Sequence, residues 1–186
     1  MRIARRLTYL PADEYLALER DAEVKREYVN GEVFAIVGAS RNHARITLNI
    51  GSKLNEALSP PCWAAVSDMK VHVEAANAYY YPDVVASCAE SQPDPYVMAN
   101  PVLIVEVLSP STERTDQREK RLNYQTVASI QEILLVAQDR RWIELYRRDR
   151  DGWTVEQISD EGMFDLASVG LTLSLDDLYR NTFLTF

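Results

Sequence analysis

The sequence has few of the residues that build disulfide frameworks and zinc sites. Among its 186 residues are two cysteines, Cys62 and Cys88, and two histidines. Two cysteines are too few for a disulfide-stapled scaffold, and their spacing is not that of zinc ligands. The sequence therefore argues against a structural zinc site, and we expect both cysteines to be reduced.

Long hydrophobic runs are also missing. The most apolar segment, residues 101–108, is eight residues long and contains Glu106, whereas a membrane-spanning helix needs about 20 apolar residues. The arginines at positions 2, 5 and 6 are followed by no apolar stretch, which argues against a signal peptide. These absences predict a cytoplasmic protein without membrane association.

Internal repeats, low-complexity tracts and flexible linkers are absent as well. A chain of this length can bury one core, so we expect residues 1–186 to form a single domain. The formal net charge of −8 argues against a broad basic face for nucleic acid. Basic residues do cluster at Arg140-Arg141 and within residues 147–150, and bound cations reverse the field around a group of carboxylates.

Apolar periodicity and turn residues predict alternating helices and strands. Asn30-Gly31, between two apolar stretches, predicts a β-hairpin over residues 27–36. Apolar residues recur every four positions in residues 42–58, as on one helix face, and the prolines that follow end this helix. Further helices are predicted over residues 11–18, 115–127 and 175–179. Further strands are predicted over residues 63–73, 81–86, 102–108, 132–137, 142–147 and 153–158. This order predicts an α/β fold with a mixed sheet covered by helices.

Two acidic residues interrupt the apolar pattern of the predicted strands. Glu106 lies inside the apolar run 102–108, and Asp83 follows Pro82 and precedes three apolar residues. Burying an unpaired carboxylate costs several kcal/mol, which is of the same order as the stability of a whole domain. Each charge must therefore be neutralised, paired or bound to a metal.

Two interpretations of these acids follow from the residue types. If their strands are neighbours, Asp83 and Glu106 can lie on one face of the sheet and share a cation. Mg²⁺ favours this arrangement, because it binds one or two carboxylates together with waters and a substrate phosphate. Alternatively, Asp83 caps a turn and Glu106 pairs with an arginine or lysine in the core.

The sequence around these acids resembles the Uma-type family of restriction-endonuclease-like proteins, long known as a domain of unknown function. That family is part of the PD-(D/E)XK nuclease superfamily. The similarity lies in Tyr81-Pro82-Asp83, in residues 106–112 (Glu-Val-Leu-Ser-Pro-Ser-Thr) and in a lysine-bearing helix after them. It extends from residues 28–32 to the closing hairpins. It implies a restriction-endonuclease-like core, a mixed β-sheet flanked by helices, with extra peripheral β-hairpins.

The resemblance also implies a metal site. Asp83 and Glu106 would be ligands of Mg²⁺ or Mn²⁺, and the main-chain carbonyl of Val107 would complete the shell. The sequence departs from the superfamily at Leu108, where the lysine of the Glu-x-Lys element is expected. A nuclease still needs a cation that stabilises the attacking hydroxide or the developing charge.

Two lysines are candidates for that cation. Lys120 shares one face of the predicted helix with Asp116 and Tyr124, four residues away on either side, and the family usually has a lysine here. Its alternative is an exposed pair with Asp116, worth about 0.3–0.5 kcal/mol. Lys70 is the second candidate, since it could project from an adjacent strand.

Two further residues match family positions near the proposed site. Glu27 could be an additional acid at the metal, although an acid beside Arg26 is more often a surface residue. His43 lies at the start of a predicted helix, where helix N-termini favour anions, and could contact a substrate phosphate. Its alternative is a packing or capping role.

The predicted function is that of a divalent-metal-dependent endonuclease that hydrolyses phosphodiester bonds in DNA. Asp83, Glu106 and Lys120 would be its catalytic residues. The alternative is a non-catalytic module, binding nucleic acid or protein, that kept the nuclease fold. The leucine at position 108 and the charge of −8 favour this alternative. We expect a homodimer, because edge strands and aromatic hairpins need cover.

Overall fold

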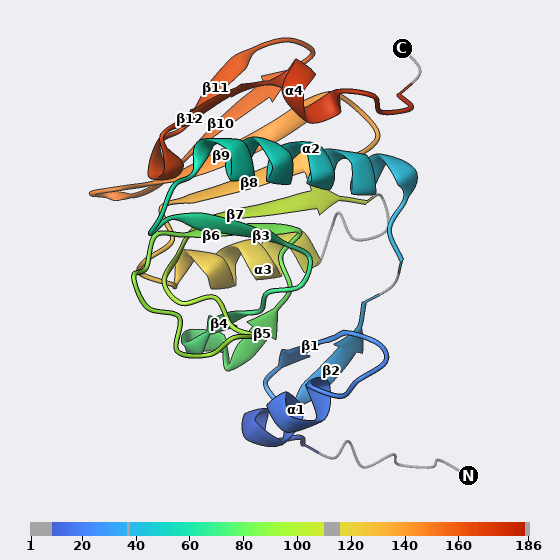
Figure 1. Ribbon diagram of the computed structural model, residues 1–186, viewed down its shortest axis with the longest axis vertical. Coiled ribbons are helices and arrows are strands. Elements are labelled where there is room, and N and C mark those ends of the chain that lie inside the picture. The colour runs from blue at the N-terminus through green and yellow to red at the C-terminus, as the bar shows by residue number, and fades with distance from the viewer. Residues whose placement is uncertain (1–8, 37, 110–115, 185–186) are drawn as a thin grey trace.

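A six-stranded mixed sheet lies at the centre of the computed structural model, which describes residues 9–36, 38–109 and 116–184 (Figure 1). Its order is β10-β9-β8-β7-β6-β3. The strands are β3 (Trp63–Val66), β6 (Val84–Ser87), β7 (Pro101–Leu108), β8 (Glu132–Ala137), β9 (Trp142–Asp149) and β10 (Gly152–Ser159). Only β7 and β8 pair in parallel. These two central strands are covered on both faces, which explains their continuous apolar runs. The predicted mixed sheet is confirmed.

Helices cover both faces of this sheet. Helices α2 (Arg41–Ala57) and α4 (Leu175–Tyr179) lie on one face and α3 (Asp116–Gln125) on the other (Figure 1). Side chains of β7 alternate between two cores: Leu103, Val105 and Val107 pack with α2 and α4, whereas Ile104 and Leu108 pack with Tyr124 of α3. Because successive strand residues point to opposite faces, Glu106 belongs to the α3 face.

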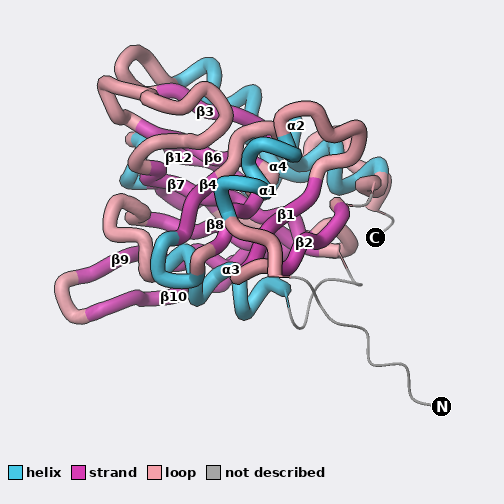
Figure 2. Tube along the Cα trace, turned by 90° about the horizontal axis from the view of Figure 1, so that it is seen from below, coloured by secondary structure: helices cyan, strands magenta, loops and turns pink. Residues whose placement is uncertain are grey.

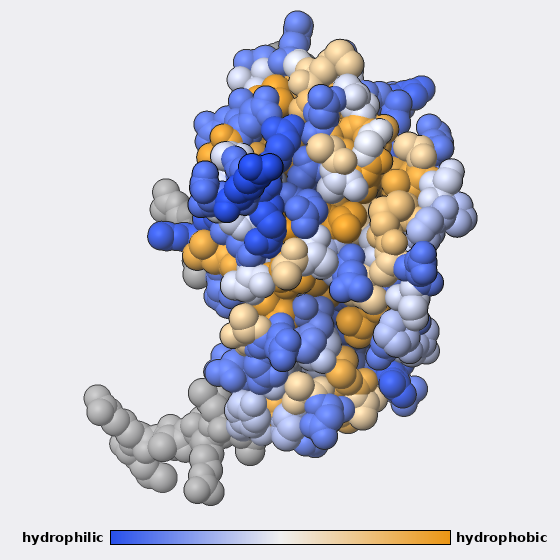
Figure 3. Space-filling model, turned by 90° about the vertical axis from the view of Figure 1, so that its left-hand side faces the viewer, coloured by the Kyte–Doolittle hydropathy of each residue, from blue (hydrophilic) through white to orange (hydrophobic). Residues whose placement is uncertain are grey.

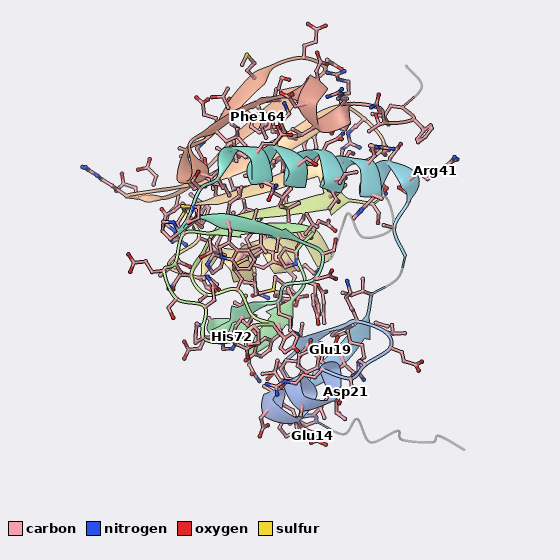
Figure 4. All side chains as sticks on the ribbon, viewed as in Figure 1. Glu14, Glu19, Asp21, Arg41, His72 and Phe164 are labelled. Atoms are coloured by element: carbon pink, nitrogen blue, oxygen red, sulfur yellow. A yellow bond between two sulfur atoms is a disulfide. The ribbon has the colours of Figure 1, made fainter. Side chains whose placement is uncertain are left out.

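A second, four-stranded sheet has the order β2-β1-β5-β4. It consists of β1 (Arg26–Val29), β2 (Glu32–Ala35), β4 (Val71–Val73) and β5 (Ala78–Tyr80), with the 3₁₀ turn Glu74–Ala76 between the last two. Helix α1 (Ala12–Glu19) packs against it through Tyr15, Tyr28 and Tyr79. The predicted β1–β2 hairpin is confirmed, since Asn30 and Gly31 at its turn have φ angles of 44° and 95°. Figure 4 shows this unit below the main sheet, with Glu19 on α1 and His72 on β4.

One predicted strand is divided between the sheets, and another begins later than predicted. Residues 63–73 form β3 in the main sheet and β4 in the second, whereas β6 begins at Val84 and not at residue 81. The single strand predicted over residues 63–73 is therefore wrong, and the strand predicted over residues 81–86 is confirmed from Val84 onward. Pro82 has no N–H for a ladder, and Ser67 adopts a left-handed φ of 58°. The two chain segments that pass between the sheets here are in contact, because the Ser67 N–H donates to the Asp83 carbonyl at 3.0 Å.

The two cysteines form a disulfide between Cys62 and Cys88, so the prediction of reduced cysteines is wrong for this structure. Each cysteine lies one position beyond the paired residues Trp63 and Ser87 of neighbouring strands β3 and β6. Cross-strand neighbours are brought together by the sheet register. A separation of 26 residues gives no sign of this in the sequence.

One hairpin extends the main sheet, and another contributes to the core that the sheet shares with α2 and α4. The predicted β9–β10 hairpin projects from the body (Figure 2), and its tip faces the viewer in the strongly hydrophilic part of Figure 3. A second hairpin, β11 (Met163–Leu166) and β12 (Leu171–Ser174) joined by the 3₁₀ turn Ala167–Val169, was not predicted. It leads into α4, which begins with a Ser174–Asp177 capping box. Within the described residues, no helix is long and apolar enough to cross a membrane.

Glu132 is a buried acid whose charge is compensated by protein groups. It is 2 % exposed at the start of β8. Its Oε1 accepts hydrogen bonds from Arg147 Nε at 3.2 Å and the Ala167 N–H at 3.1 Å. Its Oε2 accepts from the N–H and hydroxyl of Ser168 at 2.8 and 2.6 Å. Glu132 therefore anchors the C-terminal hairpin to the main sheet.

We expect Glu132→Gln to lower the free energy of unfolding by about 2–4 kcal/mol, because an amide NH₂ cannot accept from Ser168 and because Arg147 loses its buried charge partner. Glu156→Gln is the matched control. It removes an acid that is also bound to Arg147, at 2.6 Å, but whose side chain is 49 % exposed. Its cost should stay below about 1 kcal/mol. Equal losses for the two variants in urea denaturation would contradict this role for Glu132.

Candidate metal and catalytic site

Asp83 and Glu106 face each other across neighbouring strands. The β6–β7 register pairs Val84 with Val105, and the next position along the antiparallel ladder sets Asp83 opposite Glu106. Residues directly opposite in such a pair share a face of the sheet. The Val107 N–H donates to Asp83 Oδ2 at 2.7 Å, which fixes this carboxylate against the end of β7. The structure thus brings together the two acids that interrupted the apolar pattern.

Helix α3 places a tyrosine and a lysine over these acids. Tyr124, which is fully buried, donates its hydroxyl hydrogen to Glu106 Oε1 at 2.8 Å. Lys120 lies one turn earlier, on the same helix face. Its Nζ is 2.6 Å from Glu27 Oε1 and 5.4 Å from the centre of the Tyr80 ring. The shared face of Lys120 and Tyr124 is therefore directed at the acids.

The β1–β2 hairpin contributes Glu27 to the same cluster. Besides Lys120, Glu27 Oε1 accepts a hydrogen bond from the Tyr81 N–H at 3.0 Å. Its side chain is 12 % exposed, so Glu27 is not the surface residue of the alternative interpretation. It joins the second sheet to α3 and to the chain segment that leads into Asp83.

His43 reaches the site from the opposite side of the sheet. Its main-chain N–H donates to the Ser40 hydroxyl at the start of α2, at 3.1 Å, a standard helix N-cap. Its imidazole Nε2 lies 3.2 Å from Asp83 Oδ2. Burial lowers the pKa of His43, but the hydrogen bond and charge of Asp83, with smaller contributions from Glu106 and the Val107 main chain, raise it overall.

The electrostatics of the cluster are dominated by Glu106. Burial, opposed by the Lys120 charge and assisted by Asp83 and Glu27, raises the pKa of Glu106 to about 8. Burial alone would lower the pKa of the Lys120 ammonium, but the carboxylates of Glu106 and Glu27 raise it overall. The raised pKa of Lys120 keeps its amine charged at neutral pH, whereas the raised pKa of Glu106 favours its protonated form in the absence of a bound cation.

The donor set fits a hard divalent cation. Among the described residues, none donates a hydrogen bond to Asp83 Oδ1 or Glu106 Oε2, so one oxygen of each carboxylate is open. Mg²⁺ commonly binds one or two protein carboxylates and completes its shell with water and substrate. The part of the chain that the structure describes contains no group of three or more His, Cys, Asp or Glu side chains that could hold a metal. A cation here would therefore rely on main-chain and non-protein oxygens as well.

These groups line one cavity of about 930 Å³. Sequence reasoning did not select several of its other polar residues: Lys25, Ser40, Arg121, Tyr124 and Gln138. Tyr124 had a usable signal, its four-residue spacing from Lys120. The remaining four come from separate elements, and their approach depends on the tertiary fold.

Lys70 lies outside the cavity, whereas Leu108 is a core residue at its border. Lys70 is 5 % exposed but does not line the cavity; its Nζ lies 5.0 Å from the ring centre of Tyr81 and 5.6 Å from that of Tyr96. Leu108, at the position of the superfamily lysine, is buried in the core on the α3 face. Residues 110–112 of the motif lie outside the described residues. Of the two candidate lysines, the structure brings Lys120 to the acids.

The mixed sheet with helices on both faces is a restriction-endonuclease-like fold. The chain is similar to the crystal structure of "a putative nuclease belonging to DUF820" from Anabaena variabilis, with a TM-score of 0.74 and 21 % identity. The similarity covers 91 % of this chain and 97 % of that one.

A family model, "Uma2: Putative restriction endonuclease", matches residues 12–176. Two uncharacterized proteins of Synechocystis sp. are similar in sequence. The protein slr1290 is 32 % identical over 92 % of both chains. The protein sll1609 is 34 % identical over 82 % of this chain and 89 % of its own length. The chain belongs to the Uma2 family, and the resemblance seen in the sequence is confirmed.

The raised pKa of Glu106 predicts a pH-dependent stability without metal. Between pH 4.5, the ordinary pKa of a glutamate, and about pH 8, Glu106 is protonated in the folded chain and ionised in the unfolded chain. The folded state therefore loses stability as the pH rises through this window. The free energy of unfolding of the wild type should fall by up to about 5 kcal/mol over this window relative to Glu106→Gln, which is neutral throughout. Urea denaturation in EDTA at several pH values measures this. Parallel curves for the two proteins would show that Glu106 is not held protonated.

Proposed function

We propose that this protein is a divalent-metal-dependent endonuclease that hydrolyses phosphodiester bonds in DNA. The observation that carries the proposal is the placement of Asp83 and Glu106 on adjacent strands, facing each other, with Lys120 directed at the same cavity. Membership in the Uma2 family supports the same class of activity.

Asp83 and Glu106 would hold Mg²⁺ or Mn²⁺, with the Val107 carbonyl as a third protein oxygen. When bound, the cation would supply Lewis acidity at the scissile phosphate and lower the pKa of a water. The protein's own contribution is to keep two carboxylate oxygens at a fixed separation. The Val107 N–H and His43 hold Asp83, and the Tyr124 hydroxyl holds Glu106, so the ligand geometry is set before substrate binds.

Lys120 would stabilise negative charge on the phosphate as the phosphorus becomes five-coordinate. Its raised pKa suits it to this electrostatic role and not to that of a general base, which must first lose its proton. Glu27 positions the ammonium at 2.6 Å from its Oε1. Lys120 would thus take the role of the superfamily lysine, although it lies on a helix. Leu108, at the strand position of that lysine, is an apolar core residue.

His43 and Tyr124 are positioning residues in this scheme. His43 contacts Asp83 and Tyr124 contacts Glu106, so each restrains a ligand from a different helix. Fixing ligand orientation in this way is typical of the groups that surround metal sites, and their removal commonly costs about 10–100-fold in affinity or activity.

The proposal predicts that Glu106→Gln and Lys120→Gln each lower metal-dependent plasmid cleavage by at least about 100-fold. The first change removes a charge that would hold the cation, and the second removes the charge that would stabilise the phosphate. Lys70→Gln is the matched control, since Lys70 is a buried lysine that does not line the cavity. Its rate should stay within about threefold of wild type. Cleavage is measured by gel nicking assays with Mg²⁺ and with Mn²⁺, and melting curves verify folding.

Two results would count against the proposal. Equal cleavage by wild type and Glu106→Gln would place the activity elsewhere or in a contaminant. An absence of cleavage, together with no rise in wild-type melting temperature on adding Mg²⁺ or Mn²⁺, would instead favour a non-catalytic module that kept the nuclease fold.

A further inference from the structure

The cavity beside Asp83 and Glu106 has an apolar wall for which the proposed hydrolysis has no use. It is formed by four half-exposed side chains, Phe34 (49 %), Ile36 (40 %), Leu48 (54 %) and Val66 (42 %). They come from the β1–β2 hairpin and the residue after it, from α2 and from β3. Single exposed apolar residues are ordinary, but several around one cavity that also holds polar groups are typical of a binding site.

Phe34 is the aromatic member of this wall and lies next to the proposed catalytic groups. The hairpin register pairs Phe34 with Glu27, and facing residues of an antiparallel pair share one side of the sheet. Glu27 binds Lys120 at 2.6 Å. Phe34 therefore lies on the same side of the hairpin as the acid that binds Lys120, and both Phe34 and Lys120 line the cavity. Val33, the neighbouring residue, pairs with Tyr28 on the other side.

The cations of the cavity are largely committed to protein partners. Of those that line it in the described ranges, Lys25 pairs with Asp68 and Lys120 with Glu27. Arg121 donates to Gln125 at 3.3 Å and lies 4.7 Å from the centre of the Tyr146 ring. Binding of duplex DNA depends mainly on cations that neutralise several backbone phosphates. With these partners and a net charge of −8, the cavity is better suited to a base than to a row of phosphates.

We propose that the apolar wall receives an unpaired nucleobase of the DNA strand, stacked on Phe34, and that the site therefore takes single-stranded or locally unpaired DNA in preference to intact duplex. The inference rests on the proposed nuclease function and specifies its substrate class. In a duplex the base faces are already stacked and the base must leave the helix to reach such a wall. In a single strand every base has a free face for an aromatic ring.

The test measures binding by fluorescence anisotropy, with Ca²⁺ in place of Mg²⁺. The probes are a labelled oligothymidylate of about 15 nucleotides, an abasic strand of the same length and charge, and a blunt duplex. Wild type should bind the oligothymidylate more tightly than the other two. Phe34→Ala should weaken binding of the oligothymidylate by about 5- to 100-fold, the range for loss of one stacked base. It should leave binding of the abasic strand unchanged. If Phe34 only maintained the structure, its loss would weaken binding of both strands.

Val33→Ala is the matched control. Val33 is 40 % exposed on the same strand but is not part of the cavity lining, so this variant should bind all three probes like wild type. Equal weakening of the base-bearing and abasic strands by Phe34→Ala would overturn the proposal, as would a wild-type preference for duplex. A dimer that Phe34→Ala converts to a monomer in sedimentation would assign the wall to a second copy of the chain, and would also overturn it.

The cleavage assay separates failure of this inference from failure of the proposed function. Metal-dependent cleavage of duplex and single strand at equal rates, unaffected by Phe34→Ala, would end the single-strand proposal and leave the nuclease proposal standing. Absence of cleavage of either substrate would end the nuclease proposal. The anisotropy measurements would in that case still decide whether Phe34 binds a base.

Discussion

The placement of two carboxylates side by side at the end of an apolar sheet is the constraint on which the rest of this site depends. Asp83 and Glu106 face each other across β6 and β7, where mutual repulsion and burial disfavour charge on both. Three other elements supply groups that compensate: His43 from α2, Tyr124 from α3, and the Lys120–Glu27 pair between α3 and the hairpin. The contacts of these polar groups in the site therefore depend on the two acids.

The same compensation links the two sheets. Glu27 belongs to the second sheet, yet it binds an amine on a helix of the main sheet and the N–H of Tyr81, two residues before Asp83. Moving the hairpin would therefore disturb Lys120 and the segment that carries Asp83. The hairpin also brings Phe34 to the cavity through its pairing with Glu27. The Glu27–Lys120 ion pair thus links the charged groups of the site to the hairpin that carries Phe34.

Much of the fold could be predicted from the sequence because its signals are local. The Asn30-Gly31 turn, the four-residue periodicity of α2 and the apolar runs of β7 and β8 each lie within one segment, and a charge inside such a run is visible without a structure. The partners of those charges are not visible: Glu27 and Lys120 are 93 residues apart, and the Cys62–Cys88 bond depends on strand register. The break at Ser67 and the start of β6 after Pro82 were missed because neither position interrupts the β-type sequence pattern clearly.

Glu106, a proposed metal ligand, and Glu132, a structural acid, differ in how the protein satisfies their carboxylates. Both lie on adjacent parallel strands, and both interrupt or border an apolar run. Glu132 accepts two main-chain N–H bonds, a hydroxyl bond and an arginine, so both of its oxygens are satisfied and its charge is matched. In the described chain Glu106 receives one hydroxyl bond, from Tyr124, its second oxygen accepts from none of these residues, and the residue lines a cavity. An apolar residue at this position would avoid the cost of burying a carboxylate, so the place of Glu106 beside Asp83 supports the proposal that it binds a ligand from outside the chain.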